Sequence, residues 1–365
     1  MYSFEPNEEQ QMLMEAVGKF AENDLRPAAH DAEESRELPK KIINKGWELG
    51  LLQASIPEAY GGFGDHSAVT GALAVEEMAF GDLAGALAVL TPSLFAIPIL
   101  LAGSEEQKKQ YLPKIVGDAW SPYTAALIEY RFDFDPNALK TSAKSKGNDY
   151  ILSGEKAFVP YAHEAQEILV YADLDGATQG FVVPRNAPGL GISGERENLM
   201  GLNALPLYRV KLEDARIPAS NRLGGASGHD FKSILASMHI ASASAAVGVA
   251  KASFEYAKNY AKEREVFGVK IAQKQAIAFM LAEMATEIEA MRLLTWEAAW
   301  KLDNARENAA REAYLAFTGA ADMVMMVTDR GVQILGGHGY IREHPVEMWM
   351  RNGRGFAMLL GLAII

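Results

Sequence analysis

R-E-V-F-G-V-K-I-A-Q-K-Q-A-I-A-F-M-L-A-E-M, the stretch Arg264–Met284, predicts a corner between two long helices. Neither Pro nor Gly interrupts residues 250–265, and Gly268 is a suitable stop because glycine adopts positive φ at little cost. The helix that follows carries one apolar stripe at spacings of four and three residues, formed by Ile277, Leu281, Met284, Ile288 and Met291. The pattern therefore predicts two helices with a short connection between them.

The connection brings a guanidinium, an aromatic ring and an amide close together in sequence, at Arg264, Phe267 and Gln275. An arginine fork suits phosphate oxygens, and a ring offers a stacking surface for a base. A salt bridge and a core aromatic at a helix corner would leave the same pattern. Spacing alone keeps both interpretations open.

Composition limits the classes of protein that the chain can belong to. Its 365 residues are enough for two or three domains, and the absence of cysteine excludes disulfides, thiolate metal sites and cysteine nucleophiles. No metal site is predicted. A net charge of −12 argues against nucleic acid or an anionic membrane as a partner. No apolar run approaches the roughly 20 residues of a membrane span.

The N-terminal residues, M-Y-S-F-E-P-N-E-E-Q, are acidic. They resemble neither a signal peptide nor an arginine-rich transit peptide, because both of these carry positive charge near the start. A cytoplasmic location is therefore the expectation.

The apolar pattern changes twice along the chain. Helical period dominates first, with helices expected at 8–23, 39–49, 68–80, 83–101 with a break at Pro92, and from Ser104 to Val116. Short apolar segments between turn residues follow, and the strand candidates are Tyr150–Leu152, Ile168–Ala172, Gly180–Val183 and Tyr208–Leu212. Helical period then returns in four segments, roughly 230–264, 274–302, 308–335 and 345–360.

This order predicts a mainly α fold with an inserted β domain. We expect an N-terminal helical domain at 1–119, a central β-barrel or sandwich at 120–227 and a C-terminal four-helix bundle at 228–365.

Further segments match the landmarks of one family, in family order. They are I-P-E-A-Y-G-G-F-G (Ile56–Gly64), G-S-E-E-Q-K-K-Q-Y-L-P-K (Gly103–Lys114), G-E-K (Gly154–Lys156), E-D-A-R-I-P-A-S-N-R-L-G (Glu213–Gly224) and Q-I-L-G-G-H-G-Y (Gln333–Tyr340). Together with R-x-x-F-G and the Q-x-x-x-x-x-L-A-E-M that follows, they resemble the acyl-CoA dehydrogenase family over nearly the whole chain. The family has the same three-part fold.

The resemblance implies a bound FAD and the oxidation of an acyl-CoA thioester. In this reaction a desolvated carboxylate removes the α-proton while a hydride passes to the flavin. One set of family residues reaches across a dimer interface to the diphosphate and adenosine of the neighbour's FAD. The matching cofactor-binding residues here are Arg264, Phe267, Gln275, Gln333, Gly336 and Gly337.

The residues that would catalyse the reaction in this chain are changed. The usual position of the catalytic glutamate holds Leu360, and the position used by a minority of the family holds Met238. Neither side chain can accept a proton, so no catalytic residue is assigned. His239 and Glu129 remain as candidates for an unorthodox base, since an imidazole and a carboxylate can each accept a proton.

The matching contacts to the chain's own flavin are also altered. Ile128 and Pro160 stand where threonines would face the ring, and proline has no N–H to donate. Phe132, Asp133 and Phe134 add bulk and negative charge where a diphosphate would lie. The sequence therefore predicts that the chain's own flavin site is closed, while its contacts to a neighbour's flavin are retained.

This one-sided retention favours a non-catalytic subunit of a heteromeric acyl-CoA dehydrogenase, similar to the two-gene enzymes of bacterial steroid side-chain degradation. The resemblance implies a heterotetramer with a paralogous catalytic chain, a shared FAD, an acyl-CoA substrate and electron-transfer flavoprotein as acceptor. Two alternatives remain. One is a homo-oligomeric FAD enzyme with an atypical base, and the other is a non-redox CoA-binding or structural homologue.

Overall fold

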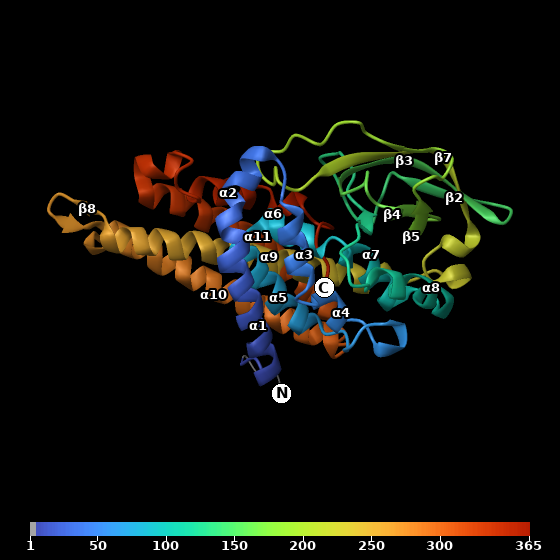
Figure 1. Cartoon of the computed structure of the whole chain (residues 1–365), viewed down its shortest axis with the longest axis horizontal. Helices are drawn as coiled ribbons and strands as arrows, with labels where there is room; N and C mark the ends of the chain where they lie inside the picture. Colours follow the sequence, from blue (N-terminus) through green and yellow to red (C-terminus); the bar gives the residue numbers. More distant parts are fainter. Residues whose placement is uncertain (1–4) are drawn as a thin grey trace.

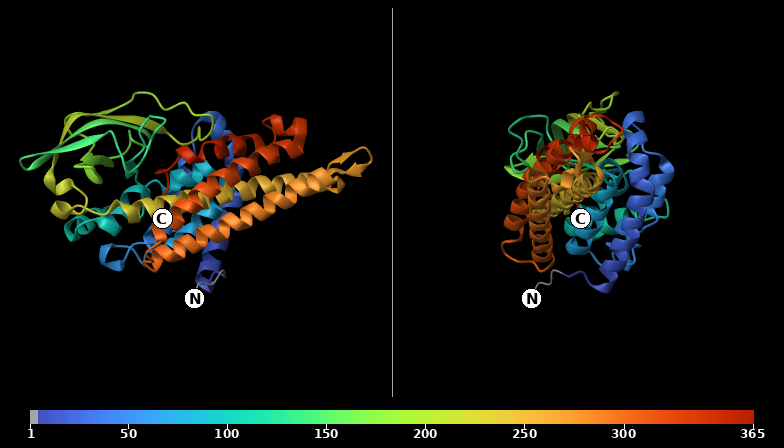
Figure 2. Two further views of the ribbon diagram at one scale, coloured as in Figure 1. Left: turned by 180° about the vertical axis from the view of Figure 1, so that it is seen from behind. Right: turned by 90° about the vertical axis from the view of Figure 1, so that its left-hand side faces the viewer.

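The computed structural model describes residues 5–365 as an elongated helical body with a β domain at one end (Figures 1 and 2). Residues 1–4, part of the acidic start on which the expectation about targeting peptides rests, lie outside the described part. The predicted order of helices, strands and helices is confirmed. The longest helix, α9 (Phe231–Glu263), runs through the body and packs against helices from both halves of the chain.

The N-terminal region is a set of mostly short helices. Their bounds are α1 (Glu8–Phe20), α2 (Arg26–Ser35), α3 (Lys40–Trp47), α4 (Leu51–Ala54), α5 (Ala68–Gly81), α6 (Leu83–Leu90), α7 (Ser93–Ala102) and α8 (Glu105–Ile115). The helix predicted at 8–23 continues instead through one π-helical turn, Ala21–Leu25, directly into α2. The predicted break at Pro92 and the capping box between Ser104 and Gln107 are confirmed.

The β domain is one curled sheet of seven strands, in the order β1-β4-β2-β3-β7-β6, with β5 paired to β4. Their bounds are β1 (Thr124–Ala126), β2 (Ser142–Lys146), β3 (Asp149–Pro160), β4 (Glu167–Leu174), β5 (Ala177–Pro184), β6 (Leu190–Ile192) and β7 (Leu207–Pro218). Neighbouring strands pair antiparallel, except that β1 and β2 run parallel to β4. The four predicted strands lie within β3, β4, β5 and β7, whereas β1, β2 and β6 are too short or too polar to predict.

The C-terminal region is built on four helices. After α9 come the hairpin strands β8 (Glu265–Val266) and β9 (Val269–Lys270), then α10 (Gln275–Asp303), α11 (Ala309–Leu335) and α12 (Val346–Arg354). Helix α12 ends earlier than predicted, because Gly353 and Gly355 flank its last residue and glycine disfavours the helical state. Residues 359–365 are irregular, yet all of them are buried.

Helix α9 is long and apolar enough to cross a membrane by length and composition. However, 94% of its most apolar window is buried inside the protein. Packing against α5, α10 and α11 accounts for that apolar surface.

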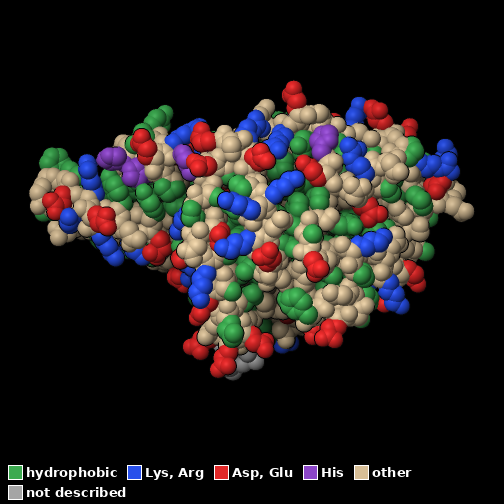
Figure 3. All heavy atoms as spheres, viewed as in Figure 1, with side chains coloured by type: hydrophobic (Ala, Val, Ile, Leu, Met, Phe, Trp, Pro, Cys, Tyr) green, Lys and Arg blue, Asp and Glu red, His purple; other side chains and the backbone are tan. Residues whose placement is uncertain are grey.

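Acidic and basic side chains are interspersed over the face shown in Figure 3. Histidine side chains gather at the end of this face where the hairpin β8–β9 lies (Figures 1 and 3). His338 and His344 belong to the connection between α11 and α12, and the centroids of their rings lie 5.5 Å apart.

Asp82 caps the N-terminus of α6 from a buried position, and its carboxylate accepts a hydrogen bond from the N–H of Gly85 at 2.7 Å. Burial raises the pKa of Asp82 from 3.8 to about 6, although the N–H groups of Gly85 and Leu83 and the charge of Arg26 oppose the rise. Between about pH 4 and about pH 6, the carboxyl group of Asp82 therefore keeps its proton in the folded state but has released it in the unfolded state. It follows that this group lowers stability as pH rises from about 4 to about 6.

We expect Asp82→Asn, which keeps an acceptor at the cap, to be more stable than the natural chain at about pH 8. The gain is at most about 3 kcal/mol, the free energy of a shift of about two pKa units, and it should shrink below about pH 5. Urea unfolding at both pH values measures it. Asp82→Ala, which also loses the cap, is the control and should be less stable than Asp82→Asn. A destabilised Asp82→Asn at the higher pH would refute the interpretation.

Candidate functional site

The stretch between α9 and α10 forms a tight hairpin at one end of the body (Figure 1). Helix α9 ends at Glu263, close to the end of the predicted segment 230–264, because Arg264 is extended (ψ 125°) and the next residues pair as strands. Phe267 and Gly268 make the turn, with φ values of 57° and 77°. Two consecutive residues at positive φ are the geometry of a type I′ hairpin turn.

Phe267 combines two unfavourable features at the tip of this hairpin. Its backbone is left-handed, which costs a residue other than glycine about 1 kcal/mol. Its ring is 91% exposed, so it gains little from burial within this chain. Strain together with an exposed aromatic ring indicates a contact made with another molecule.

A cavity of about 880 Å³, which we call the hairpin pocket, lies between the hairpin and the adjoining ends of α9, α10 and α11. Four predicted cofactor-binding residues line it, namely Arg264, Phe267, Gly336 and Gly337. Gln275 and Gln333 each lie next in sequence to a residue that lines the hairpin pocket. Both are exposed, and neither of them lines the pocket. The structure therefore joins two segments separated by about 70 residues into one pocket, as the resemblance implies.

Three helix ends determine the electrostatics of the hairpin pocket. The C-terminal ends of α9 and α11 carry negative partial charge, and the N-terminal end of α10 carries positive partial charge. Lys274 occupies the N-cap position of α10, but its side chain makes no hydrogen bond to the first turn of the helix. The N–H groups of that turn therefore have no side-chain acceptor at the N-cap. With the guanidinium of Arg264, this helix end suits a phosphate or diphosphate.

The hairpin pocket and the β domain lie at opposite ends of the long axis (Figures 1 and 2). A ligand held against the β domain of this chain therefore cannot reach Arg264 or Phe267 of the same chain. These residues can act only on a ligand held in the hairpin pocket alone, or on one that a second chain presents.

The two positions expected for a catalytic base are both buried among apolar side chains. Leu360 and Met238 belong to one apolar cluster with Leu127, and they are 6%, 0% and 2% exposed. Ile128 and Pro160, at the predicted flavin face, are also buried. Apolar side chains therefore occupy both positions where the resemblance puts a catalytic base.

The loop after β1 is closed by ion pairing within itself. The guanidinium of Arg131 lies 3.0 Å from the carboxylate of Asp133 and donates to the backbone oxygen of Ala138 at 2.6 Å. Phe134 packs against the core, whereas the ring of Phe132 is fully exposed. The loop that replaces the family's diphosphate-binding segment thus pairs its added negative charge with Arg131 and exposes the ring of Phe132.

The comparisons with known proteins agree over the whole chain. Residues 7–118, 126–215 and 229–362 match the N-terminal, middle and C-terminal domains of acyl-CoA dehydrogenases. The short-chain specific acyl-CoA dehydrogenase of Bos taurus mitochondria is 36% identical over 363 residues, which are 96% of this chain and 86% of that protein.

The chain belongs to the acyl-CoA dehydrogenase family.

Two further relatives within the acyl-CoA dehydrogenase family are informative. The CarC subunit of the caffeyl-CoA reductase–Etf complex of Acetobacterium woodii is 34% identical, over 97% of this chain and 95% of that protein. The structure of butyryl-CoA dehydrogenase from Megasphaera elsdenii superimposes with a TM-score of 0.88 at 30% identity, covering 100% of this chain and 96% of the other.

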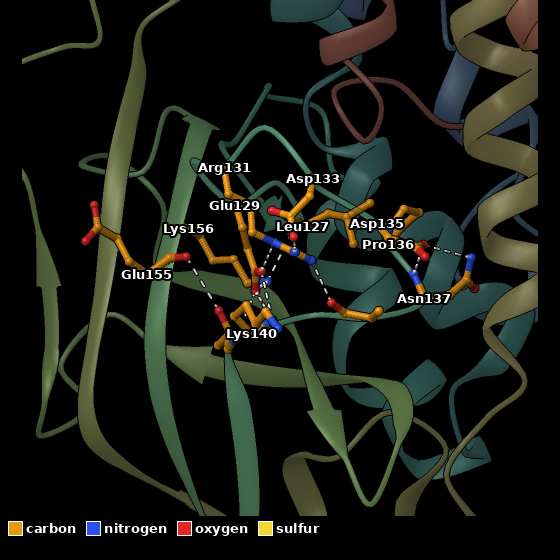
Figure 4. Close-up of polar contacts among 12 residues, drawn as sticks. Leu127, Glu129, Arg131, Asp133, Asp135, Pro136, Asn137, Lys140, Glu155 and Lys156 are labelled. Atoms are coloured by element: carbon orange, nitrogen blue, oxygen red, sulfur yellow. Dashed lines mark hydrogen bonds and ion pairs between the residues drawn. The ribbon is translucent and has the colours of Figure 1, made fainter.

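Glu129 holds a structural position in this member of the acyl-CoA dehydrogenase family (Figure 4). Its buried carboxylate lies 3.0 Å from Nζ of Lys156 and accepts the N–H groups of Lys140 and Thr141 at 2.8 and 2.7 Å. Burial alone would raise the pKa of Glu129, but Lys156 and these N–H groups outweigh it and lower the pKa to about 2. A carboxylate so fully paired is a weak base, so the structure argues against Glu129 as an unorthodox base.

His239 is also poorly suited to be the base of an acyl-CoA dehydrogenase. It is buried on α9, with its ring 5.1 Å from Phe317 and 5.5 Å from Tyr314 between centroids. Burial lowers the pKa of His239 to about 4, so the ring is neutral and weakly basic at pH 7. It behaves as a core residue of the interface between α9 and α11.

Three polar residues of the hairpin pocket are absent from the sequence-based prediction. Tyr260, Lys274 and His338 line the pocket beside Arg264. Tyr260 precedes Arg264 by one helical turn of α9, a spacing that the sequence shows. Nothing in the sequence pairs Tyr260 with His338, because they are 78 residues apart.

Proposed function

We propose that this chain is the non-catalytic subunit of a heteromeric acyl-CoA dehydrogenase. In this proposal its hairpin pocket holds the adenosine diphosphate half of an FAD whose ring is bound by a paralogous catalytic chain. One observation carries the proposal: the residues suited to a nucleotide lie at the end of the molecule opposite its own β domain. Membership of the acyl-CoA dehydrogenase family supports FAD as the cofactor.

The residues of the hairpin pocket fit this half of the cofactor. Arg264 and the N-terminus of α10 supply donors for the diphosphate, and the exposed ring of Phe267 offers a stacking surface for adenine. A Cβ added at Gly336 or Gly337 would meet no atom within 4 Å, so both face open space that a ligand can enter. FAD, when bound, supplies the ring that accepts the hydride.

The catalytic carboxylate belongs to the partner in this proposal, because Leu360 and Met238 provide none here. An acyl-CoA thioester is the substrate, and electron-transfer flavoprotein is the proposed acceptor, as the name of the relative in the caffeyl-CoA reductase–Etf complex supports. A steroid side-chain CoA ester is the more specific substrate that we propose, because the sequence resembles the two-gene enzymes of bacterial steroid side-chain degradation. The named relatives include short-chain and butyryl-CoA enzymes, so both substrate classes belong in the test.

Co-expression tests the proposal. This chain carries an affinity tag and is produced alone, and with each paralogous chain of the same organism that keeps the catalytic glutamate. Turnover is measured with an artificial electron acceptor on butyryl-CoA and on a steroid side-chain CoA ester. We expect turnover only when a paralogue co-purifies. Turnover by the chain alone, or the failure of every paralogue to co-purify, would refute the proposal.

A further inference from the structure

We propose that His338 is a further ligand of the nucleotide diphosphate in the hairpin pocket and that Tyr260 holds it in position. The inference rests on the proposed function and adds a residue to its site. His338 lines the pocket together with Arg264 and Lys274, and it comes from the turn that follows α11. Three cationic or potentially cationic side chains therefore meet in one cavity.

Two hydrogen bonds fix the histidines of this region against α9. The hydroxyl of Tyr260 lies 2.8 Å from Nδ1 of His338, and the hydroxyl of Tyr256 lies 2.8 Å from Nδ1 of His344. The tyrosines are four residues apart, so they stand one above the other on one face of the helix. The two Tyr–His pairs thus have the same arrangement, one helical turn apart on α9, but only His338 lines the hairpin pocket.

The bond to Tyr260 leaves Nε2 as the ring nitrogen of His338 that can serve a ligand. When the tyrosine hydroxyl donates to Nδ1, the neutral imidazole carries its proton on Nε2 and donates from there. When the ring is protonated, both nitrogens donate and the tyrosine oxygen accepts. In both of these states Nε2–H is a donor, which is the requirement for binding a phosphate oxygen, whereas a neutral ring with its proton on Nδ1 would donate to the tyrosine oxygen and leave Nε2 as an acceptor.

The helix ends explain why a third cation is useful here. The C-terminal ends of α9 and α11 disfavour an anion, whereas the N-terminus of α10 favours it. A cation on the turn after α11 compensates for the carbonyl groups of that helix end. The titratable and charged groups around His338 are Tyr260 of α9, Arg264 at its end, Lys274 before α10, and His344 of the following loop.

The inference predicts nucleotide binding that depends on pH through one residue. ADP-ribose is a suitable probe, because its diphosphate is a diester and keeps the same charge between about pH 5.5 and 8. Isothermal titration of the purified full chain should show about tenfold tighter binding at the lower pH, since a hydrogen bond from a charged donor is stronger than one from a neutral donor. In His338→Gln, which keeps a donor without the charge, this pH dependence should vanish.

Matched variants separate positioning from folding. His344→Gln alters the parallel Tyr–His pair outside the pocket and should keep the pH dependence. Tyr260→Phe removes only the hydroxyl and should weaken binding at both pH values. If binding is lost in Arg264→Ala but His338→Gln matches the natural chain at both pH values, this inference fails and the proposed function stands. If ADP-ribose does not bind the natural chain at all, both fail.

Discussion

Replacing Arg264 with alanine is expected to weaken FAD binding to the heteromeric enzyme about 100-fold. A hydrogen bond from a charged donor contributes about 1.5–3 kcal/mol, and an arginine can make two of them to a diphosphate. A loss of about 2.7 kcal/mol corresponds to a factor of about 100 in the dissociation constant. FAD titration of the cofactor-stripped complex, followed by flavin fluorescence, measures the change.

The variant must lose affinity without losing the fold. Arg264 is exposed at the end of α9, so its replacement should leave the urea midpoint of the complex unchanged. Arg311→Ala is the matched control, because Arg311 is an exposed arginine near the other end of α11, about 36 Å of helix from the hairpin pocket. Equal FAD affinity in the Arg264 and Arg311 variants would show that the hairpin pocket does not hold the cofactor.

Removing either partner of the buried pair Glu129–Lys156 is expected to destabilise the chain by about 3–5 kcal/mol. The Nζ atom of Lys156 is completely buried and is held by Glu129 and the backbone oxygen of Leu127, each at 3.0 Å. Lys156→Met leaves the buried carboxylate with less compensation, and Glu129→Gln does the same to the ammonium. Urea unfolding of both variants measures the loss.

This experiment also decides what Glu129 does. A catalytic base would give a Glu129→Gln variant that folds normally and has lost turnover, whereas a structural ion pair gives one that unfolds more easily. Glu155→Gln, on the strand that carries Lys156, is the control, since Glu155 is half-exposed and pairs with Arg209, and it should cost less than about 1 kcal/mol. Natural stability in Glu129→Gln would contradict the structural role.

Much of the helical architecture follows from the sequence, because long apolar stripes and caps are local signals. Met284 and Ile288 of the predicted stripe are buried, its other three residues pack partly buried against the core, and the capping box at Ser104 is present. The hairpin between α9 and α10 escapes prediction because its strands have two residues each, too few to show alternation. The π-helical turn at Ala21–Leu25 escapes because it continues the helical pattern without a cap.

The candidate site is predictable only where residue type alone is informative. Arg264 and Phe267 can be recognised by type and order, and both line the hairpin pocket. The roles of Glu129 and His338 depend on partners distant in sequence, Lys156 and Tyr260, at separations of 27 and 78 residues. Such pairs arise from tertiary packing, which a single sequence does not reveal.

The most direct test of the account is the flavin content of the purified chain alone after equilibration with excess FAD and gel filtration, compared with its complex with the catalytic paralogue. Absorbance of the released flavin, divided by the protein concentration, gives the ratio of flavin to chains. The account predicts that the complex retains half as many flavins as chains. The lone chain holds only the adenosine diphosphate half of FAD, in the hairpin pocket, and should therefore release its flavin during gel filtration. A lone chain that retains one flavin per polypeptide would contradict it.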